Sequence, residues 1–202
     1  MKKSKAETAE TRKRIVKVAS QEFKRTGIQA TRVSEIMAAA GLTHGGFYRH
    51  FDSKEQLLAE ACATAMGNLA EKARTAVKGG KGAFADYLSE FMSRAFHEDC
   101  SGSCAFVTMG SELARADDRT RNAMTEGFRT WIDILAEQDP EKDSKAAHAD
   151  AMFKLSAMIG AVTMARIIDD ADFADDVLTE ARARLVEPVP KRSKKTPATQ
   201  DV

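Results

Sequence analysis

The chain has 202 residues, of which 43% are hydrophobic and 30% charged, as expected of a soluble globular protein of one or two domains. This composition excludes a membrane-spanning protein, because no run approaches the roughly 18 apolar residues that a span needs. Three cysteines are too few for a disulfide scaffold, and the N-terminal sequence lacks the apolar core of a secretory signal, so we expect a cytoplasmic protein with no membrane partner.

Charge is distributed unevenly along the chain. Residues 1–56 hold 12 Lys and Arg against 6 Asp and Glu, a net charge of +6, whereas residues 57–186 hold 15 against 22, a net charge of −7. A basic N-terminal part on an acidic body indicates that one surface binds a polyanion and that another has a different task.

The apolar periodicity is helical nearly throughout, with no alternating strand pattern, so we expect an all-α fold. In the first helix Ile15, Ala19 and Phe23 repeat every four residues, and Gly27 ends it. The helices expected span residues 9–25, 31–40, 43–51, 54–76, 83–98, 105–114, 118–137, 144–170 and 173–185.

These elements group into domains. We expect a flexible arm at residues 1–8, a three-helix helix-turn-helix domain at 9–53, a helical ligand-binding and dimerisation domain at 54–186, and a disordered tail at 187–202. The second and third helices meet at Gly41, which can adopt the left-handed turn of a DNA-reading helix-turn-helix. The tail is polar, basic and proline-containing.

The third helix contains Gly45 and Gly46 side by side, although each glycine costs a helix roughly 1 kcal/mol relative to alanine. A side chain at either position would hold the helix away from a DNA duplex. We therefore expect the glycines to let the backbone approach DNA, while packing of Phe47 and Phe51 stabilises the helix. The alternative is that the two glycines only mark a loop.

The residues around these glycines suit a polyanion. Hydroxyl groups lie at two helix starts, where free N–H groups attract phosphate. His44 is the best placed side chain for a base edge, and Tyr48 and Arg49 can donate to phosphate oxygens. The expected DNA-binding residues are Thr31, Arg32, Ser34, Thr43, His44, Gly45, Gly46, Tyr48, Arg49 and Lys54.

The segment from Thr11 to Leu57, above all its stretch GFYRHFDSKEQL, resembles the DNA-binding domain of the TetR family of bacterial transcription regulators. One departure is Met37, where the family most often has alanine. The resemblance implies that Tyr48 and Lys54 contact phosphate and that His44 to Gly46 face the bases.

The last two helices are expected to form a homodimer interface. Specific DNA binding usually needs two DNA-binding domains on a symmetric site, so a dimer is expected. Small residues on one helix permit the close approach of another helix. The resemblance implies that two helices of each subunit form a four-helix bundle, although an ordinary core hairpin is the alternative. The expected interface residues are Ala157, Gly160, Ala161, Met164, Leu178, Ala181 and Leu185.

The middle helices are expected to enclose a pocket for a small apolar or electrophilic effector. Trp131 is the first choice for a ligand contact, because a buried indole N–H needs a partner. The expected lining is Phe91, Cys104, Met109, Phe128, Trp131 and Phe153. We expect no cofactor and no metal.

The cysteines allow a second interpretation. Cys104 is expected in the first turn of a helix, where the thiol pKa is lowered, and Cys100 lies near enough to form a disulfide with it, as in a redox or electrophile sensor. His97 with these two cysteines is a weaker metal hypothesis.

An enzyme is disfavoured because the four histidines are scattered and no nucleophile–base pair is visible. A helical adaptor protein would not need the basic N-terminal part. The function expected is therefore a ligand-responsive repressor that binds a palindromic operator as a dimer, with activation as the alternative to repression.

Overall fold

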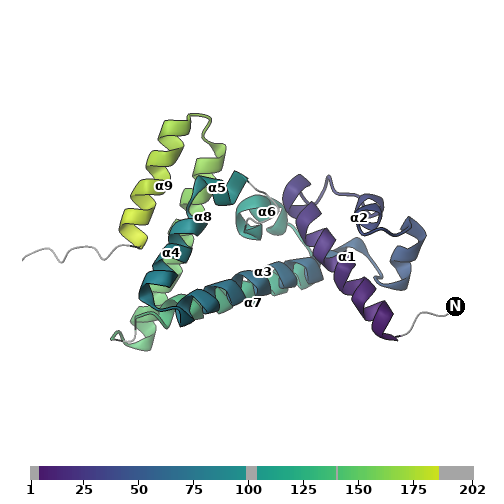
Figure 1. Cartoon of the computed structure of the whole chain (residues 1–202), viewed down its shortest axis with the longest axis horizontal. Helices are drawn as coiled ribbons and strands as arrows, with labels where there is room; N and C mark the ends of the chain where they lie inside the picture. The colour runs from purple at the N-terminus through teal and green to yellow at the C-terminus, as the bar shows by residue number, and fades with distance from the viewer. Residues whose placement is uncertain (1–4, 99–103, 140, 187–202) are drawn as a thin grey trace, which may run out of the picture.

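The computed structural model describes residues 5–98, 104–139 and 141–186, which form helices without any strand (Figure 1). The all-α prediction is confirmed for these parts of the chain. The elements are α1 (Lys5–Thr26), α2 (Val33–Ala39), the 3-10 helix η1 (His44–Arg49), α3 (Lys54–Lys78), α4 (Lys81–Phe91), α5 (Arg94–Glu98), α6 (Ala105–Leu113), α7 (Asp118–Ala136), α8 (Ser144–Ile167) and α9 (Ala171–Leu185). The predicted tail at 187–202 lies outside the described residues.

The elements α1, α2 and η1 form a small N-terminal unit, residues 5–53, which we call the head; residues 54–186 are the body (Figure 1). Helix α1 begins at Lys5, so the predicted arm at 1–8 is wrong for residues 5–8. Glu7 stabilises this first turn, because an acidic side chain is favourable near a helix N-terminus. The backbone carbonyl of Glu7 also accepts a hydrogen bond from the Thr11 hydroxyl at 2.7 Å.

Two glycines make the turns of the head. Gly27 and Gly41 have φ angles of +85° and +70°, a region that disfavours any residue with a Cβ. Gly27 ends α1 and Gly41 follows α2, as the sequence predicts. The chain reverses at these points and brings Phe23, Ile36 and Phe47 into one core, each at most 1% exposed.

The segment after Gly41 is a 3-10 helix, whereas an α-helix from residue 43 to 51 was expected. The amide of Gly46 donates to the carbonyl of Thr43 at 3.0 Å, and that of His50 donates to Phe47 at 2.8 Å, both across three residues. Thr43 occupies the N-cap position but its side chain makes no capping hydrogen bond. The tighter helix is consistent with the low helix propensity of adjacent glycines.

In the body, α3 and α7 run side by side along the molecule (Figure 1). They are in close contact at Gly127, where an added Cβ would lie 2.7 Å from Met66 Cγ. Ser53 caps α3 by accepting from the amide of Gln56, and Asp117 caps α7 by accepting from that of Thr120. These caps explain why both helices begin within a residue of their predicted starts.

A single helix was expected over residues 83–98, and the structure divides it into α4 and α5. Met92 is fully buried after the end of α4, and the hydroxyl of Ser93 accepts from the amide of Phe96 at 3.3 Å. Ser93 thus makes the kind of side-chain bond that starts a helix, and the chain turns at this point.

Helices α8 and α9 pack against each other at the end of the body away from the head (Figure 1). Helix α8 ends at Ile167, earlier than the predicted residue 170. Asp170 instead caps α9 by accepting from the amide of Phe173 at 3.0 Å. Within the described residues, no helix is both long and apolar enough to cross a membrane.

Candidate functional site

The head carries most of the predicted DNA-binding residues on its surface. Seven of the ten side chains or backbone positions are exposed, on the start of α2 and on η1, which pack against each other. Tyr48 is 69% exposed although its neighbour Phe47 is buried. The exposed seven are Arg32, Ser34, Thr43, His44, Gly45, Tyr48 and Arg49.

Stacked aromatic rings hold η1 in place. The rings of Phe47 and Phe51 have centroids 5.6 Å apart, and both side chains are 1% exposed. The rings of Tyr48 and Phe47 meet edge to face with centroids 5.2 Å apart, while most of the Tyr48 side chain is exposed to solvent. The predicted packing of Phe47 and Phe51 under the glycine-containing helix is confirmed.

Thr31 is a correction to the prediction. Its side chain is 1% exposed, and its hydroxyl donates to the carbonyl of Gly27 at 2.6 Å and lies 2.6 Å from the hydroxyl of Thr26. A buried hydroxyl that satisfies a turn carbonyl cannot reach a phosphate. Thr31 therefore stabilises the turn between α1 and α2 and was wrongly placed on the DNA surface.

Lys54, for which a phosphate contact is predicted, is half-buried. Its ammonium donates to the carbonyl of Ile28 at 2.6 Å and lies 5.9 Å from the ring centroid of Phe23. The first role of this side chain is to connect the start of α3 to the turn after α1.

The two adjacent glycines have different surroundings. A Cβ at Gly45 would meet nothing within 4 Å, whereas one at Gly46 would lie 3.6 Å from the end of Met37. Met37, the departure from the family pattern noted above, is fully buried. The absence of a side chain at Gly46 leaves room for the end of this methionine. Gly45 is the position whose bare backbone faces open space.

An ion-pair network joins the head to the body. Arg12 on α1 forms a bidentate pair with Glu60 on α3, donates to the carbonyl of His50 at 3.2 Å, and stacks over the ring of Phe51. The hydrogen bond from Arg12 lowers the pKa of Glu60 below its ordinary value. The sequence offered no signal for this pair, because its members lie 48 residues apart.

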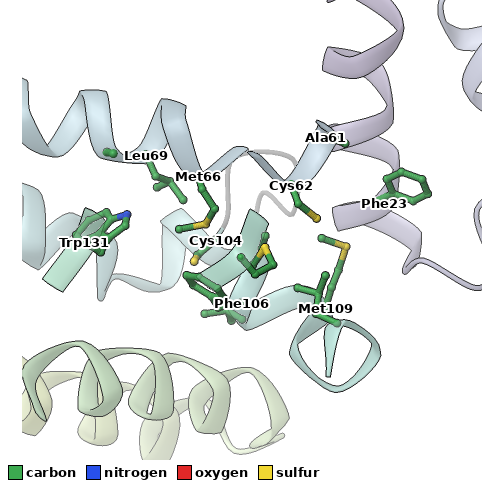
Figure 2. Close-up of a cluster of buried hydrophobic side chains, with 14 of the residues drawn as sticks. Phe23, Ala61, Cys62, Met66, Leu69, Cys104, Phe106, Met109 and Trp131 are labelled. Atoms are coloured by element: carbon green, nitrogen blue, oxygen red, sulfur yellow. The ribbon is translucent and has the colours of Figure 1, made fainter. Parts of the chain in front are cut away.

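The predicted pocket lining does not enclose one pocket. Four of its six residues are at most 3% exposed and belong to the closed core between α3, α6 and α7, part of which Figure 2 shows. These four are Phe91, Cys104, Met109 and Trp131. Phe153 is 70% exposed on the outer side of α8 and is wrongly assigned to a pocket.

Phe128 lines an open cleft of about 310 Å³ between α6, α7 and α8. Its ring stacks on Phe106 with centroids 3.6 Å apart and an angle of 13° between the planes. The cleft is mostly apolar, with one guanidinium, and its volume lies at the lower end of the range for small-molecule sites. The other lining residues are Gly110, Leu113, Ala114, Arg121, Met124, Thr125 and Ile159.

The environment of Cys104 is opposite to the one that a reactive thiol needs. The residue is 3% exposed at the N-cap of α6, among the core side chains that Figure 2 shows. Burial raises its pKa to about 11 and that of Cys62 to about 12, so the predicted lowering of the Cys104 pKa is wrong. Cys100 and the side chain of His97 lie outside the described residues.

The predicted dimer residues differ in their burial and fall into three groups. Ala161 and Leu178 are buried between α8 and α9 of the same chain, so they contribute to the core of the subunit. Met164 is 53% exposed, and the remaining four, Ala157, Gly160, Ala181 and Leu185, are half-buried. Sequence reasoning did not assign three further exposed apolar side chains to this interface, which are Met152, Ile167 and Phe173 at 50%, 77% and 55% exposure.

Two family models match the two parts of the chain. The model of bacterial regulatory proteins of the tetR family matches residues 15–61, and the model of the C-terminal domain of LmrA/YxaF-like transcriptional regulators matches residues 81–179. Together they span more than two thirds of the chain.

Relatives and solved structures agree with this assignment. An HTH-type transcriptional regulator of Mycobacterium tuberculosis is 26% identical over 195 residues, which are 91% of this chain and 98% of that protein. The HTH-type transcriptional repressor BepR of Brucella suis is 43% identical over 54 residues, 27% of this chain and 26% of its own. A crystal structure of a TetR transcriptional regulator from Chloroflexus aurantiacus is 28% identical with a TM-score of 0.71, and the match covers 88% of this chain and 95% of that one. The chain therefore belongs to the TetR family and is a DNA-binding transcriptional regulator with a helix-turn-helix head and a helical body.

Proposed function

We propose that this regulator is a repressor that binds a palindromic operator as a homodimer and releases it when a small apolar effector binds to the body. The observation that carries the proposal is the exposed surface of η1, on which His44, Gly45 and Tyr48 face solvent above the stacked Phe47 and Phe51. A helix held in this way can enter the major groove while its aromatic underside stays in the head.

Repression is supported by the relative BepR, a transcriptional repressor that is 43% identical to this chain over 54 residues. A TetR-type repressor acts where the chromosome is, so we place the protein in the cytoplasm.

The dimer is proposed to form through the outer face of α8 together with α9. On α8, Met152, Phe153, Met164 and Ile167 fall within about a third of the helix circumference at 100° per residue, and each is at least 50% exposed. Phe173 at the start of α9 is 55% exposed. So much apolar surface on one side of two packed helices is typical of an isologous four-helix interface.

The effector is proposed to bind in the cleft lined by Phe106 and Phe128. Aromatic rings, Met124 and Ile159 favour an apolar ligand, and Arg121 at the rim favours a ligand with a carboxylate or another acidic group. The burial and raised pKa of Cys104 argue against covalent capture of an electrophile there.

DNA binding is tested with the full-length protein and duplexes selected from a random pool. We expect the selected sequences to be palindromic, with half-sites about one helical turn or a multiple apart, and affinity to fall steeply with salt. A protein that selects no sequence at low salt would contradict the proposal.

Dimerisation is tested with Ile167→Glu, which places a charge on the outer face of α8. We expect this variant to sediment as a monomer and to lose affinity for the full palindromic duplex. The control is Glu126→Lys on the exposed side of α7, which should remain a dimer. A variant that remains dimeric would place the interface elsewhere.

A further inference from the structure

The turn between α1 and α2 is held by two side chains of the body, Glu112 and Lys54. The carboxylate of Glu112 on α6 accepts from the amide of Ile28 at 3.0 Å and from that of Gln29 at 2.8 Å. The ammonium of Lys54 donates to the carbonyl of Ile28 at 2.6 Å. Both amides and the carbonyl between them are therefore bound by residues that lie outside the head.

Gly27 makes this contact possible. A Cβ at Gly27 would lie 2.9 Å from Oε2 of Glu112, a distance that real Cβ atoms essentially never show. The left-handed φ of +85° also turns the following amides outward, toward α6. The glycine thus serves both the turn and the approach of the carboxylate.

We propose that Glu112 is a positioning residue for DNA binding, which fixes the orientation of the head relative to the body. The inference rests on the proposed dimer, since the angle of each head then decides the distance between the two recognition helices. A carboxylate with two amide donors is a strong, directional contact, because charge-assisted hydrogen bonds are about twice as strong as neutral ones.

The location of Glu112 explains why this contact can matter for regulation. Helix α6 places Gly110, Leu113 and Ala114 on the proposed effector cleft, within two residues of Glu112. The helix is also packed against α1 and α8, so the same nine residues touch the head, the cleft and the proposed dimer helices.

The first test measures hydrogen exchange of the backbone amides in the full-length protein. Glu112→Gln keeps the shape of the side chain but leaves one acceptor oxygen for the two backbone amides of Ile28 and Gln29. The NH2 group of the new side chain then faces one of these N–H groups and cannot accept from it. We expect exchange of the Ile28 and Gln29 amides to become about tenfold or more faster, which corresponds to the loss of roughly one charged hydrogen bond. Unchanged exchange at both amides would overturn the proposal.

The second test separates positioning from stability. Wild type and Glu112→Gln are compared on the selected duplex and on duplexes with one base pair added to or removed from its centre. We expect the wild type to bind the duplexes of altered spacing much more weakly than the selected duplex. Glu112→Gln should lose about tenfold in affinity for the selected duplex, and its preference for that duplex over the other two should be several-fold smaller than that of the wild type. A spacing preference equal to that of wild type would show that Glu112 only stabilises the fold and would overturn the proposal.

The matched control is Glu126→Gln on α7, whose carboxylate pairs only with the exposed Arg129 in the described structure. It should leave both measurements unchanged. If wild type selects no duplex, the proposed operator binding fails, and the amide exchange still decides whether Glu112 holds the turn.

Discussion

The head and the body are stabilised in different ways. The head consists of α1 and two elements of 7 and 6 residues, α2 and η1, which are too short to be stable alone and depend on Phe23, Phe47 and Phe51. In the body, α3 and α7 have 25 and 19 residues and pack along their lengths, with Gly127 directly against Met66. The head therefore depends on a few large side chains and on polar contacts with the body, whereas the long helices of the body pack against each other.

The difference matters for a regulator. Short elements that are fixed by Arg12 and by the amide contacts of Glu112 can change orientation when a few polar contacts change, without loss of the body's core.

The largest effect is expected for Phe51→Ala. Removing a buried phenylalanine costs about 3–5 kcal/mol, so the head should loosen and DNA affinity should be lost. The single tryptophan, Trp131, is buried in the body and reports on it separately. We expect the Trp131 fluorescence of the variant to remain native in the absence of denaturant. A wild-type-like DNA affinity, or a Trp131 signal that is lost together with the head, would contradict the independence of the two regions.

A smaller effect is expected in the body for Gly127→Ala. The new methyl group would lie 2.7 Å from Met66 Cγ and 2.9 Å from Met66 Cβ, so α3 and α7 must separate slightly. Overpacking of this kind costs about 1–3 kcal/mol, to be measured by urea denaturation followed through Trp131. The control is Gly67→Ala on α3, where a Cβ meets nothing within 4 Å and the substitution should stabilise the helix. Equal stability of the two variants would refute the close packing.

Substitutions on the exposed surface of η1 should leave the fold intact and change DNA binding. Tyr48→Ala should weaken binding to all sequences by about 1 kcal/mol, as expected for a phosphate contact. His44→Ala should also change the base preference at one position, by about 1–3 kcal/mol. The measurement is a binding assay on the selected duplex and its single-base variants. Equal losses on every duplex for both variants would refute the role of His44.

The smallest effect concerns the pH dependence of the Arg12–Glu60 pair. Because Arg12 lowers the pKa of Glu60 below its ordinary 4.5, the stabilisation is fully present above about that pH and is lost as the pH falls through the lower, folded-state pKa. At pH 7, Glu60→Gln should cost about 1 kcal/mol of unfolding free energy. In urea titrations this difference between variant and wild type should shrink as the pH is lowered below 4.5, and a difference that grows would contradict the sign.

Sequence patterns predict the head better than the body for a physical reason. The turns at Gly27 and Gly41 and the stacking of Phe47 on Phe51 involve residues close in the chain, so their spacing already shows the turns and the aromatic packing. The 3-10 geometry of η1 and the burial of Thr31 were not visible, because they depend on hydrogen bonds that the residue types leave open.

The sites of the body depend on contacts between distant segments. Phe153 on α8 and Leu178 on α9 both fit the apolar periodicity of their helices, yet Phe153 faces solvent and Leu178 faces α8. Glu112 accepts from the amides of Ile28 and Gln29, which lie 84 and 83 positions earlier in the chain, and no local sequence pattern indicates this contact. Only the packing of α6 against α1 shows that this carboxylate of the body contacts the head.

The most direct test of DNA reading by η1 is the affinity of Gly45→Leu for the selected duplex. The backbone at Gly45 is not in the left-handed region, and a side chain there meets nothing within 4 Å, so the fold should be retained. A leucine would instead occupy the space into which the DNA groove must fit. We predict a loss of tenfold or more, that is about 1.4 kcal/mol or more, with unchanged thermal stability and no loss for Gly67→Leu. Affinity equal to that of wild type would contradict the account.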